Sequence, residues 1–164
     1  QHARLLDLMS AWRTHLPSGF VAAEVVGLGM NRAELADNPQ LHRYLVHDLN
    51  LRPTLPFADA EFDGAMCCVS VQYLTHPVAV FREVCRVLKP GAPFVVTFSN
   101  RCFPTKAVGV WRATEDDEHL ALVARYFEEA GGWEDITAED RSGDDPDANP
   151  LFAVWARKAA PTAS

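Results

Sequence analysis

Four polar side chains follow two apolar runs in this sequence and are the first candidates for binding or chemistry. Gln72 and Tyr73 come directly after one run, and Asn100 and Arg101 come directly after the next. Parallel strands would bring them to the carboxyl edge of a sheet, where open α/β sheets bind their ligands. Arg101 offers a rigid fork of donors that suits a polar or anionic ligand. A second interpretation stays open, in which Tyr73 is an apolar anchor, Asn100 forms a turn and Arg101 is solvated.

The histidines and cysteines form no pattern typical of a metal site. None of the six histidines is paired at i,i+4 with an acid between them. The cysteines lie inside or beside predicted core segments without CxxC spacing, which favours buried, reduced thiols in a cytoplasmic protein. They are Cys67, Cys68, Cys85 and Cys102. We therefore expect no metal ion, and no His, Lys or carboxylate stands out as a general base.

The two apolar runs belong to one predicted strand, helix, strand unit. Residues 64–71 form an almost unbroken apolar run, which is typical of a strand covered on both faces. A helix is predicted over 77–88, because apolar residues recur there at helical spacing and a proline and a glycine follow. Residues 94–98 are β-branched and aromatic and form the second strand. A helical crossover of this kind implies parallel strands.

Length, composition and charge bound the class of protein. The 164 residues, 48% of them apolar and 23% charged, suit one globular domain, which we place at 1–158 with a disordered tail at 159–164. The net charge of −7 argues against a nucleic-acid partner. We also expect no membrane span and no signal segment, since no apolar run is long enough for either.

A family resemblance rests on the string Arg86-Val87-Leu88-Lys89-Pro90-Gly91 and on Phe62-Asp63 before the first strand of the unit. The unit resembles the second half of a class I S-adenosylmethionine-dependent methyltransferase of the small-molecule, type 11-like group. The resemblance implies a Rossmann-like three-layer α/β/α fold. Its sheet would have seven mostly parallel strands in the order 3-2-1-4-5-7-6, with one antiparallel terminal strand. It also implies S-adenosylmethionine as cofactor and a small-molecule methyl acceptor.

The rest of the chain follows the family's order of elements. The other predicted strands are 4–8, 24–28, 44–46, 133–140 and 151–156, and the other predicted helices are 32–37 and 115–130. The last two strands are close in sequence, so they must pair antiparallel. Family members usually carry a further helical segment before the first strand, and that segment covers part of the cofactor.

The first predicted strand ends where the resemblance implies a cofactor contact. Asp7 occupies the acidic position, but Met9 and Ser10 stand where the family has a glycine-rich turn that lets the cofactor approach the backbone. Ser10 offers a hydroxyl and backbone N–H groups, and we expect it to start a short helix. Asp7 contacts the ligand or caps the following turn, and both roles stay open.

The second strand lacks the acid that holds the ribose in this family. Gly29 stands at that position, followed by Met30 and Asn31. Gly29 and Met30 can bring backbone close to a ribose, and Asn31 can supply a side-chain hydrogen bond in place of the acid. Asn31 is also the predicted N-cap of the helix 32–37, with Glu34 at the capping-box position.

Two further strand ends complete the predicted cofactor site. The resemblance implies that Asp48 and its neighbour Leu49 hold the adenine, whose amino group a carboxylate accepts well. Ser70 lies near the end of the 64–71 run, beside the place where family members hold the transferable methyl group, and Gln72, Tyr73, Asn100 and Arg101 would bind the acceptor. Asp63 is expected to order a turn.

Two functions from different classes are consistent with these residues. The first is methyl transfer from S-adenosylmethionine to a small molecule, in which the protein mainly aligns donor and acceptor. The second is a degenerate methyltransferase fold that serves as a non-catalytic interaction or regulatory module, because the glycine-rich turn and the ribose acid are absent. A nicotinamide dehydrogenase fits poorly, since the first strand has no GxGxxG.

Overall fold

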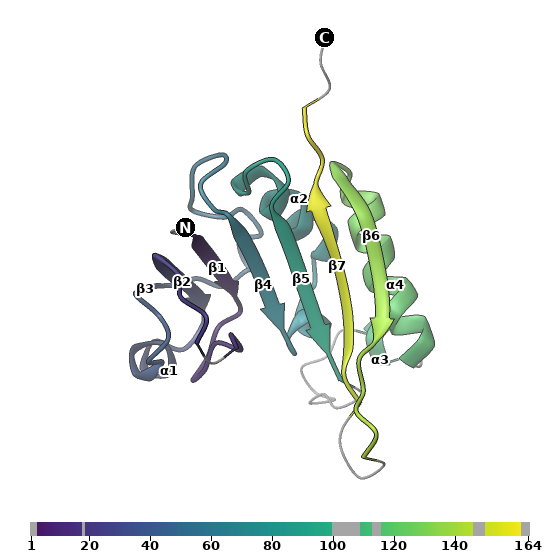
Figure 1. Ribbon diagram of the computed structural model, residues 1–164, viewed down its shortest axis with the longest axis horizontal. Coiled ribbons are helices and arrows are strands. Elements are labelled where there is room, and N and C mark those ends of the chain that lie inside the picture. The colour runs from purple at the N-terminus through teal and green to yellow at the C-terminus, as the bar shows by residue number, and fades with distance from the viewer. Residues whose placement is uncertain (1–2, 18, 100–108, 113–115, 146–149, 162–164) are drawn as a thin grey trace.

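The computed structural model describes residues 3–17, 19–99, 109–112, 116–145 and 150–161. In these residues seven strands form one sheet in the order β3-β2-β1-β4-β5-β7-β6, which confirms the predicted order (Figure 1). The strands are β1 (Arg4–Leu8), β2 (Glu24–Gly29), β3 (Arg43–Val46), β4 (Gly64–Cys68), β5 (Pro93–Phe98), β6 (Trp133–Asp140) and β7 (Phe152–Lys158). The first five are parallel, and β7 runs antiparallel to both β5 and β6.

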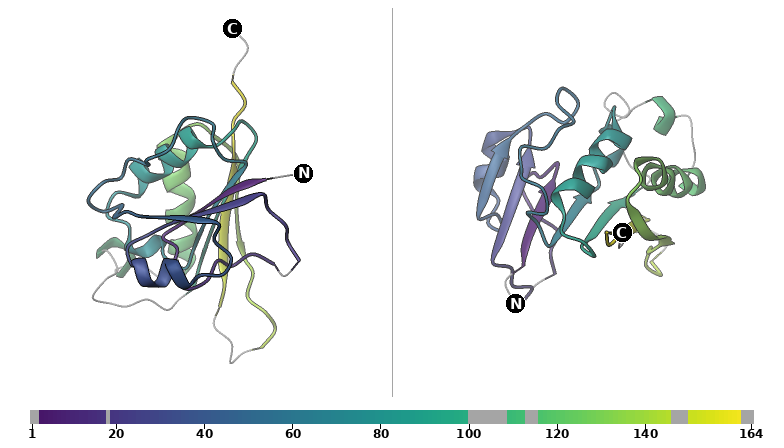
Figure 2. Two further views of the ribbon diagram at one scale, coloured as in Figure 1. Left: turned by 90° about the vertical axis from the view of Figure 1, so that its left-hand side faces the viewer. Right: turned by 90° about the horizontal axis from the view of Figure 1, so that it is seen from above.

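Helices cover one face of the sheet more completely than the other. The helices are α1 (Arg32–Asp37), α2 (Pro77–Val87), α3 (Gly109–Arg112) and α4 (Asp116–Ala130), with a 3-10 turn η1 (Val71–Tyr73). The ribbons of α2 and α4 lie together on the far side of the sheet in Figure 1, and Figure 2 shows them from other directions. Phe81 of α2 packs edge-on against Phe94 of β5 and Phe127 of α4, which joins both helices to the main hydrophobic core.

The opposite face is covered only in part. Leu35 of α1 lies against the end of β2, whereas residues 9–17 and 19–23, which connect β1 to β2, contain no helix. The prediction that Ser10 starts a short helix was therefore wrong. Pro17 and Gly19 are poor helix formers. The Ser10 and Thr14 hydroxyls instead donate to a buried carboxylate, which offers this backbone an alternative to helix.

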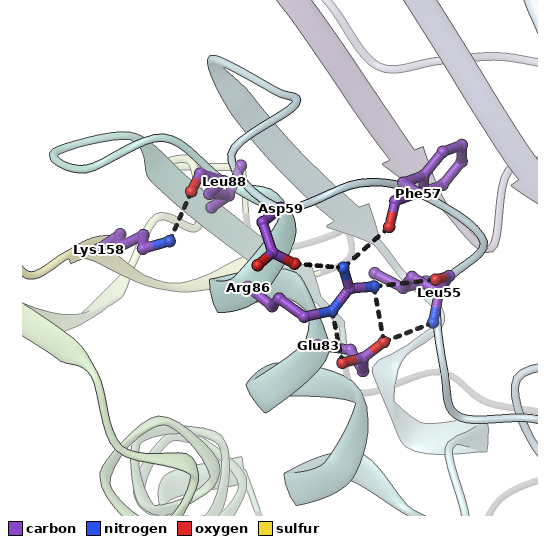
Figure 3. Close-up of polar contacts among 7 residues, drawn as sticks. All are labelled: Leu55, Phe57, Asp59, Glu83, Arg86, Leu88 and Lys158. Carbon is purple, nitrogen blue, oxygen red and sulfur yellow. Dashed lines mark hydrogen bonds and ion pairs between the residues drawn. The ribbon is translucent and has the colours of Figure 1, made fainter.

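Arg86, the first residue of the string 86–91, clamps α2 to the loop before β4 (Figure 3). The Arg86 guanidinium donates to the Glu83 carboxylate at 2.9 and 3.0 Å and to the Asp59 carboxylate at 2.8 Å. It also donates to the carbonyl oxygens of Leu55 and Phe57 at 3.0 and 2.9 Å. Chiefly because Arg86 donates to it, the pKa of Glu83 is lowered. This fork of donors ties the loop to the helix.

The remaining residues of the string end α2 and lead toward β5, which begins at Pro93. Leu88 is fully buried, and its carbonyl accepts a hydrogen bond from the Lys158 ammonium at 2.8 Å (Figure 3). Lys89 pairs with Asp63 at 3.0 Å. The other oxygen of Asp63 accepts from the Arg4 backbone N–H at 2.9 Å, so this carboxylate orders the approach to β4, as predicted. Gly91 has φ +81°, a conformation that favours glycine.

The Arg86 clamp makes a testable contribution to stability. We expect Arg86→Lys to lower the free energy of unfolding by about 2 kcal/mol, because hydrogen bonds to charged groups contribute about 1.5–3 kcal/mol and lysine lacks the planar fork. Urea unfolding measures this change. Arg82→Lys on the same helix is the control, because within the described part of the chain Arg82 donates one long bond, of 3.4 Å, to the Ala130 carbonyl. Equal effects of the two substitutions would contradict the clamp.

Candidate functional site

A cavity of about 410 Å³ lies at the carboxyl ends of β1, β2 and β3 and beside the residues that follow β4. Every residue predicted to bind the cofactor lines it, except Asp7. The lining residues are Met9, Ser10, Ala11, Leu28, Gly29, Met30, Asn31, Glu34, His47, Asp48, Leu49, Asn50 and Ser70. Trp12 is 53% exposed and does not line the cavity, so the residues that replace the glycine-rich turn leave it open.

Asp7 lies beneath the cavity wall. Its carboxylate is buried and accepts hydrogen bonds from the hydroxyls of Ser10 and Thr14, both at 2.7 Å. Burial raises the pKa of Asp7, although both hydrogen bonds and nearby His15 favour the charged form. Asn38 at the end of α1 donates from its amide to Thr14 Oγ1 at 3.1 Å and to the Ala11 carbonyl at 3.0 Å. Asp7 therefore organises the loop, which matches the capping alternative.

Two residues with strained backbone flank the cavity. Met9 has φ +53°, so it adopts the left-handed conformation that a glycine would adopt more easily. Val69 has φ +50°, which is rare for a β-branched residue, and its N–H donates to the Thr97 carbonyl at 2.7 Å. The turn at Val69 directly precedes Ser70, which lines the cavity. Strain of this kind concentrates at functional sites.

The end of β2 and the loop after β1 are in close contact. The Ser10 N–H donates to the Leu28 carbonyl at 2.8 Å. A Cβ added to Gly29 would lie 2.3 Å from the Ser10 carbonyl oxygen and 3.1 Å from Leu35 Cδ2. Gly29 is thus required by the path of the loop, and the acid that the family carries at this position would not fit.

The wall that follows β3 is held by Asp48 and Asn50. Asp48 Oδ1 accepts from the Asn50 backbone N–H at 2.9 Å, which leaves Oδ2 without a partner in the described part of the chain. The Asn50 side chain donates to the Tyr73 carbonyl at 2.9 Å and accepts from the Thr75 N–H at 3.0 Å. Asn50 therefore ties this wall to η1, and Asp48 presents a carboxylate oxygen to the cavity.

Glu34 and His47 are cavity residues that the sequence analysis did not assign to the site. The Glu34 backbone N–H donates to Asn31 Oδ1 at 3.2 Å, which confirms Asn31 as the N-cap of α1. The half-buried Glu34 carboxylate has no hydrogen bond or ion pair to any residue that the structure describes. His47 Nε2 lies 2.8 Å from the Arg52 carbonyl. The sequence could have indicated Glu34, because it lies in the first turn of α1, the helix that follows β2.

Of the residues predicted to bind the acceptor, the structure describes Gln72 and Tyr73. Gln72 is buried and donates to the Val69 carbonyl at 3.2 Å, and its Oε1 has no hydrogen-bond partner among the residues that the structure describes. Tyr73 packs against the main hydrophobic core, which fits its alternative role as an anchor. Neither residue lines the cavity. Asn100 and Arg101 lie outside the described residues.

A second hollow of about 530 Å³ lies over β4 and β5 on the partly covered face. Met66, Val95 and Leu16 contribute to its almost entirely apolar lining. It also contains Cys68, whose pKa burial raises to about 11, so this thiol is neutral. It offers neither a carboxylate nor an amide side chain, so the cavity at the strand ends is the better candidate for polar recognition.

The described residues contain neither a metal site nor a membrane-spanning helix. Among the described residues, no three His, Cys, Asp or Glu side chains lie close enough together to hold a metal ion. No helix there is long and apolar enough to cross a membrane. Cys67 and Cys85 are buried and Cys68 is half-buried, and all three are free thiols. Cys102 lies outside the described residues.

Comparison with known proteins finds sequence relatives of part of the chain. Residues 12–96, more than half of the chain, match the family described as methyltransferase domain. Methyltransferase phqN of Penicillium fellutanum is 37% identical over 83 residues, which cover 47% of this chain and 26% of that protein. The ubiquinone/menaquinone biosynthesis C-methyltransferase UbiE of Chromobacterium violaceum is 46% identical over 47 residues, which cover 28% of this chain and 19% of that protein. The chain thus spans less than a third of either relative.

Solved structures share the fold along the whole chain. A chain from the complex between a Haloferax volcanii methyltransferase activator and a methyltransferase superposes with a TM-score of 0.72 at 17% identity. That match covers 100% of this chain and 85% of the other. The predicted Rossmann-like architecture is therefore confirmed.

The buried Asp7 carboxylate predicts an unusual pH dependence. Its pKa in the folded protein lies above the ordinary value of 3.8. The protonated carboxyl therefore stabilises the fold below the unfolded pKa, and this contribution is lost as the pH rises through the folded pKa. Relative to Asp7→Asn, which still accepts hydrogen bonds, the wild type should lose stability over that window and then level off. Urea unfolding of both proteins from about pH 3 to about pH 8 tests this. A difference independent of pH would contradict it.

The contact between Gly29 and Ser10 gives a second prediction. Gly29→Ala should destabilise the protein by about 1–3 kcal/mol, because a Cβ at 2.3 Å from a backbone oxygen forces the loop to move. Thermal or urea unfolding measures the loss. Gly143→Ala is the matched control, since no atom of the described residues lies within 4 Å of its added Cβ. If Gly29→Ala is as well tolerated as Gly143→Ala, the loop does not need this glycine.

Proposed function

The chain belongs to the methyltransferase domain family, and we propose that it transfers a methyl group from S-adenosylmethionine to a small-molecule acceptor. The observation that carries this proposal is the cavity at the carboxyl ends of β1, β2 and β3, lined by Glu34 and Asp48. Open α/β sheets bind ligands at this edge. The chain matches only part of its curated relatives, so their methyl acceptors are not carried over to it.

The chemistry of the lining suits an adenosyl ligand. Glu34 and Asp48 are acceptors, and among the described residues no lysine or arginine lines the cavity. Such a site favours a ligand that carries hydroxyl and amino donors and a positive charge, and it disfavours the phosphates of a dinucleotide. Leu28 and Leu49 are buried and apolar, which suits the flat face of an adenine. The predicted contact of Asp48 with the adenine amino group fits this arrangement.

The protein's part in the reaction is positioning. When bound, S-adenosylmethionine supplies a methyl group that its sulfonium already activates for transfer. This chain must therefore orient donor and acceptor and exclude water, and it needs no nucleophile of its own. Ser70, placed at the cavity by the strained turn at Val69, is the described residue that we assign to the side of the methyl group. Asn100 and Arg101 remain the proposed acceptor contacts.

A non-catalytic interaction module remains the alternative function. Met9 and Ser10 in place of glycines, and Gly29 in place of the ribose acid, favour it. The Haloferax volcanii structure is itself a complex with a protein activator, so a protein partner is compatible with this fold. Ligand binding separates the two functions, because only the enzyme requires an adenosyl ligand in the cavity.

Calorimetry with S-adenosylhomocysteine tests the proposed function. We expect the wild type to bind, and a ligand present at a hundred times its Kd should add about 2.7 kcal/mol to the free energy of unfolding. Asp48→Asn should weaken binding about tenfold or more, because it removes a charged acceptor. Asp63→Asn is the control, since Asp63 bonds to Arg4 and Lys89 and does not line the cavity.

Three outcomes are decisive. Absence of binding to the wild type, together with an unchanged melting temperature at millimolar ligand, would overturn the proposed function in favour of the interaction module. Equal effects of Asp48→Asn and Asp63→Asn would overturn the assignment of Asp48 to the adenine. Binding without turnover of S-adenosylmethionine in the presence of candidate acceptors would limit the protein to ligand binding.

A further inference from the structure

We infer that Glu34, from the first turn of α1, recognises the ribose diol of the bound nucleoside and so sets the selectivity of the site for a ribose over a deoxyribose. This inference rests on the proposed function and deepens it. Gly29 at the end of β2 has no side chain that could bind the ribose, and the inference gives this role to Glu34 of α1.

The first step is the exclusion of the strand end. A carboxylate at residue 29 would need a Cβ, and a Cβ there would lie 2.3 Å from the Ser10 carbonyl oxygen. Ser10 cannot retreat freely, because its N–H is bonded to the Leu28 carbonyl at 2.8 Å and its hydroxyl to Asp7 at 2.7 Å. The loop that closes one wall of the cavity therefore occupies the space of an acid at this position.

The second step asks which side chains near Gly29, Asn31 or Glu34, are available to accept hydrogen bonds from a ligand. The side-chain oxygen of Asn31, predicted to replace the acid, already accepts the Glu34 backbone N–H at 3.2 Å. That bond fixes the first turn of α1 and therefore the position from which the Glu34 side chain starts. The Glu34 carboxylate is half-buried, lines the cavity and has no partner among the described residues.

The third step assigns different groups of the ligand to the Asp48 and Glu34 carboxylates, because their hydrogen-bond partners within the protein differ. Asp48 uses one oxygen for the Asn50 N–H at 2.9 Å, which leaves one oxygen for a single donor such as an amino group. Glu34 has both oxygens available, and two oxygens match the two hydroxyl donors of a vicinal diol. Glu34 follows β2 and Asp48 follows β3, so the two groups approach the ligand from neighbouring strand ends.

The test compares S-adenosylhomocysteine with its 2′-deoxyribose counterpart by calorimetry. The wild type should bind the ribose ligand about tenfold or more tightly than the deoxyribose ligand, the effect of one hydrogen bond to a charged group. Glu34→Gln should remove most of this ratio by weakening the ribose ligand, and Glu34→Asp should restore part of it. Asp48→Asn should weaken both ligands equally. Asp37→Asn, on the same helix but outside the cavity, should change neither.

The outcomes separate this inference from the function on which it rests. If the wild type binds neither ligand, the proposed function fails and the role of Glu34 fails with it. If the wild type prefers the ribose ligand and Glu34→Gln keeps the same preference, only the role of Glu34 is overturned. Circular dichroism and the melting temperature of Glu34→Gln show whether the variant is folded, and the Glu34→Asp variant gives a second measurement of the same ratio.

Discussion

The interaction on which the cavity depends is the buried Asp7 carboxylate, which accepts hydrogen bonds from the Ser10 and Thr14 hydroxyls at 2.7 Å. The chain between β1 and β2 has no helix in its described residues, so it cannot satisfy its backbone in the usual way. Asn38 extends the network to α1 through Thr14 and the Ala11 carbonyl. The polar network thus supplies hydrogen bonds that order this loop, as the backbone hydrogen bonds of a helix would otherwise do.

Because this network sets the path of the loop after β1, the residue that must lack a side chain is Gly29 of β2 and not a glycine in the loop. Met9 carries a side chain but takes a left-handed conformation with φ +53°, and the loop then passes directly over Gly29. The backbones of the loop and of β2 can approach this closely only because the residue at the contact, Gly29, lacks a Cβ. The missing glycine turn and the missing strand-end acid are therefore consequences of one change in packing, and neither by itself indicates a dead site.

Local patterns predicted the elements, and long-range contacts decided the site. The apolar spacing of α2, the stop at Pro90 and Gly91 and the short link between β6 and β7 are readable within a few residues, and the strand order follows from the family resemblance that they support. The family resemblance also implied the place of the Asp48 carboxylate, and its contact with the adenine stays a prediction. The role of Asp7 could not be chosen from the sequence, because its partner Thr14 is seven residues away in a segment with no periodicity.

The two walls of the cavity are held by separate polar clamps, and this arrangement bears on binding. The loop that begins at Asp48 is fixed to α2 by Arg86, through the Leu55 and Phe57 carbonyls, and the wall that begins at Met9 is fixed by Asp7. Because both walls are ordered by contacts within the protein, a ligand does not bear the cost of ordering them when it binds. Under the proposed function, such a cavity does not depend on a glycine-rich turn for binding, since Glu34 and Asp48 line it with carboxylates that can accept hydrogen bonds.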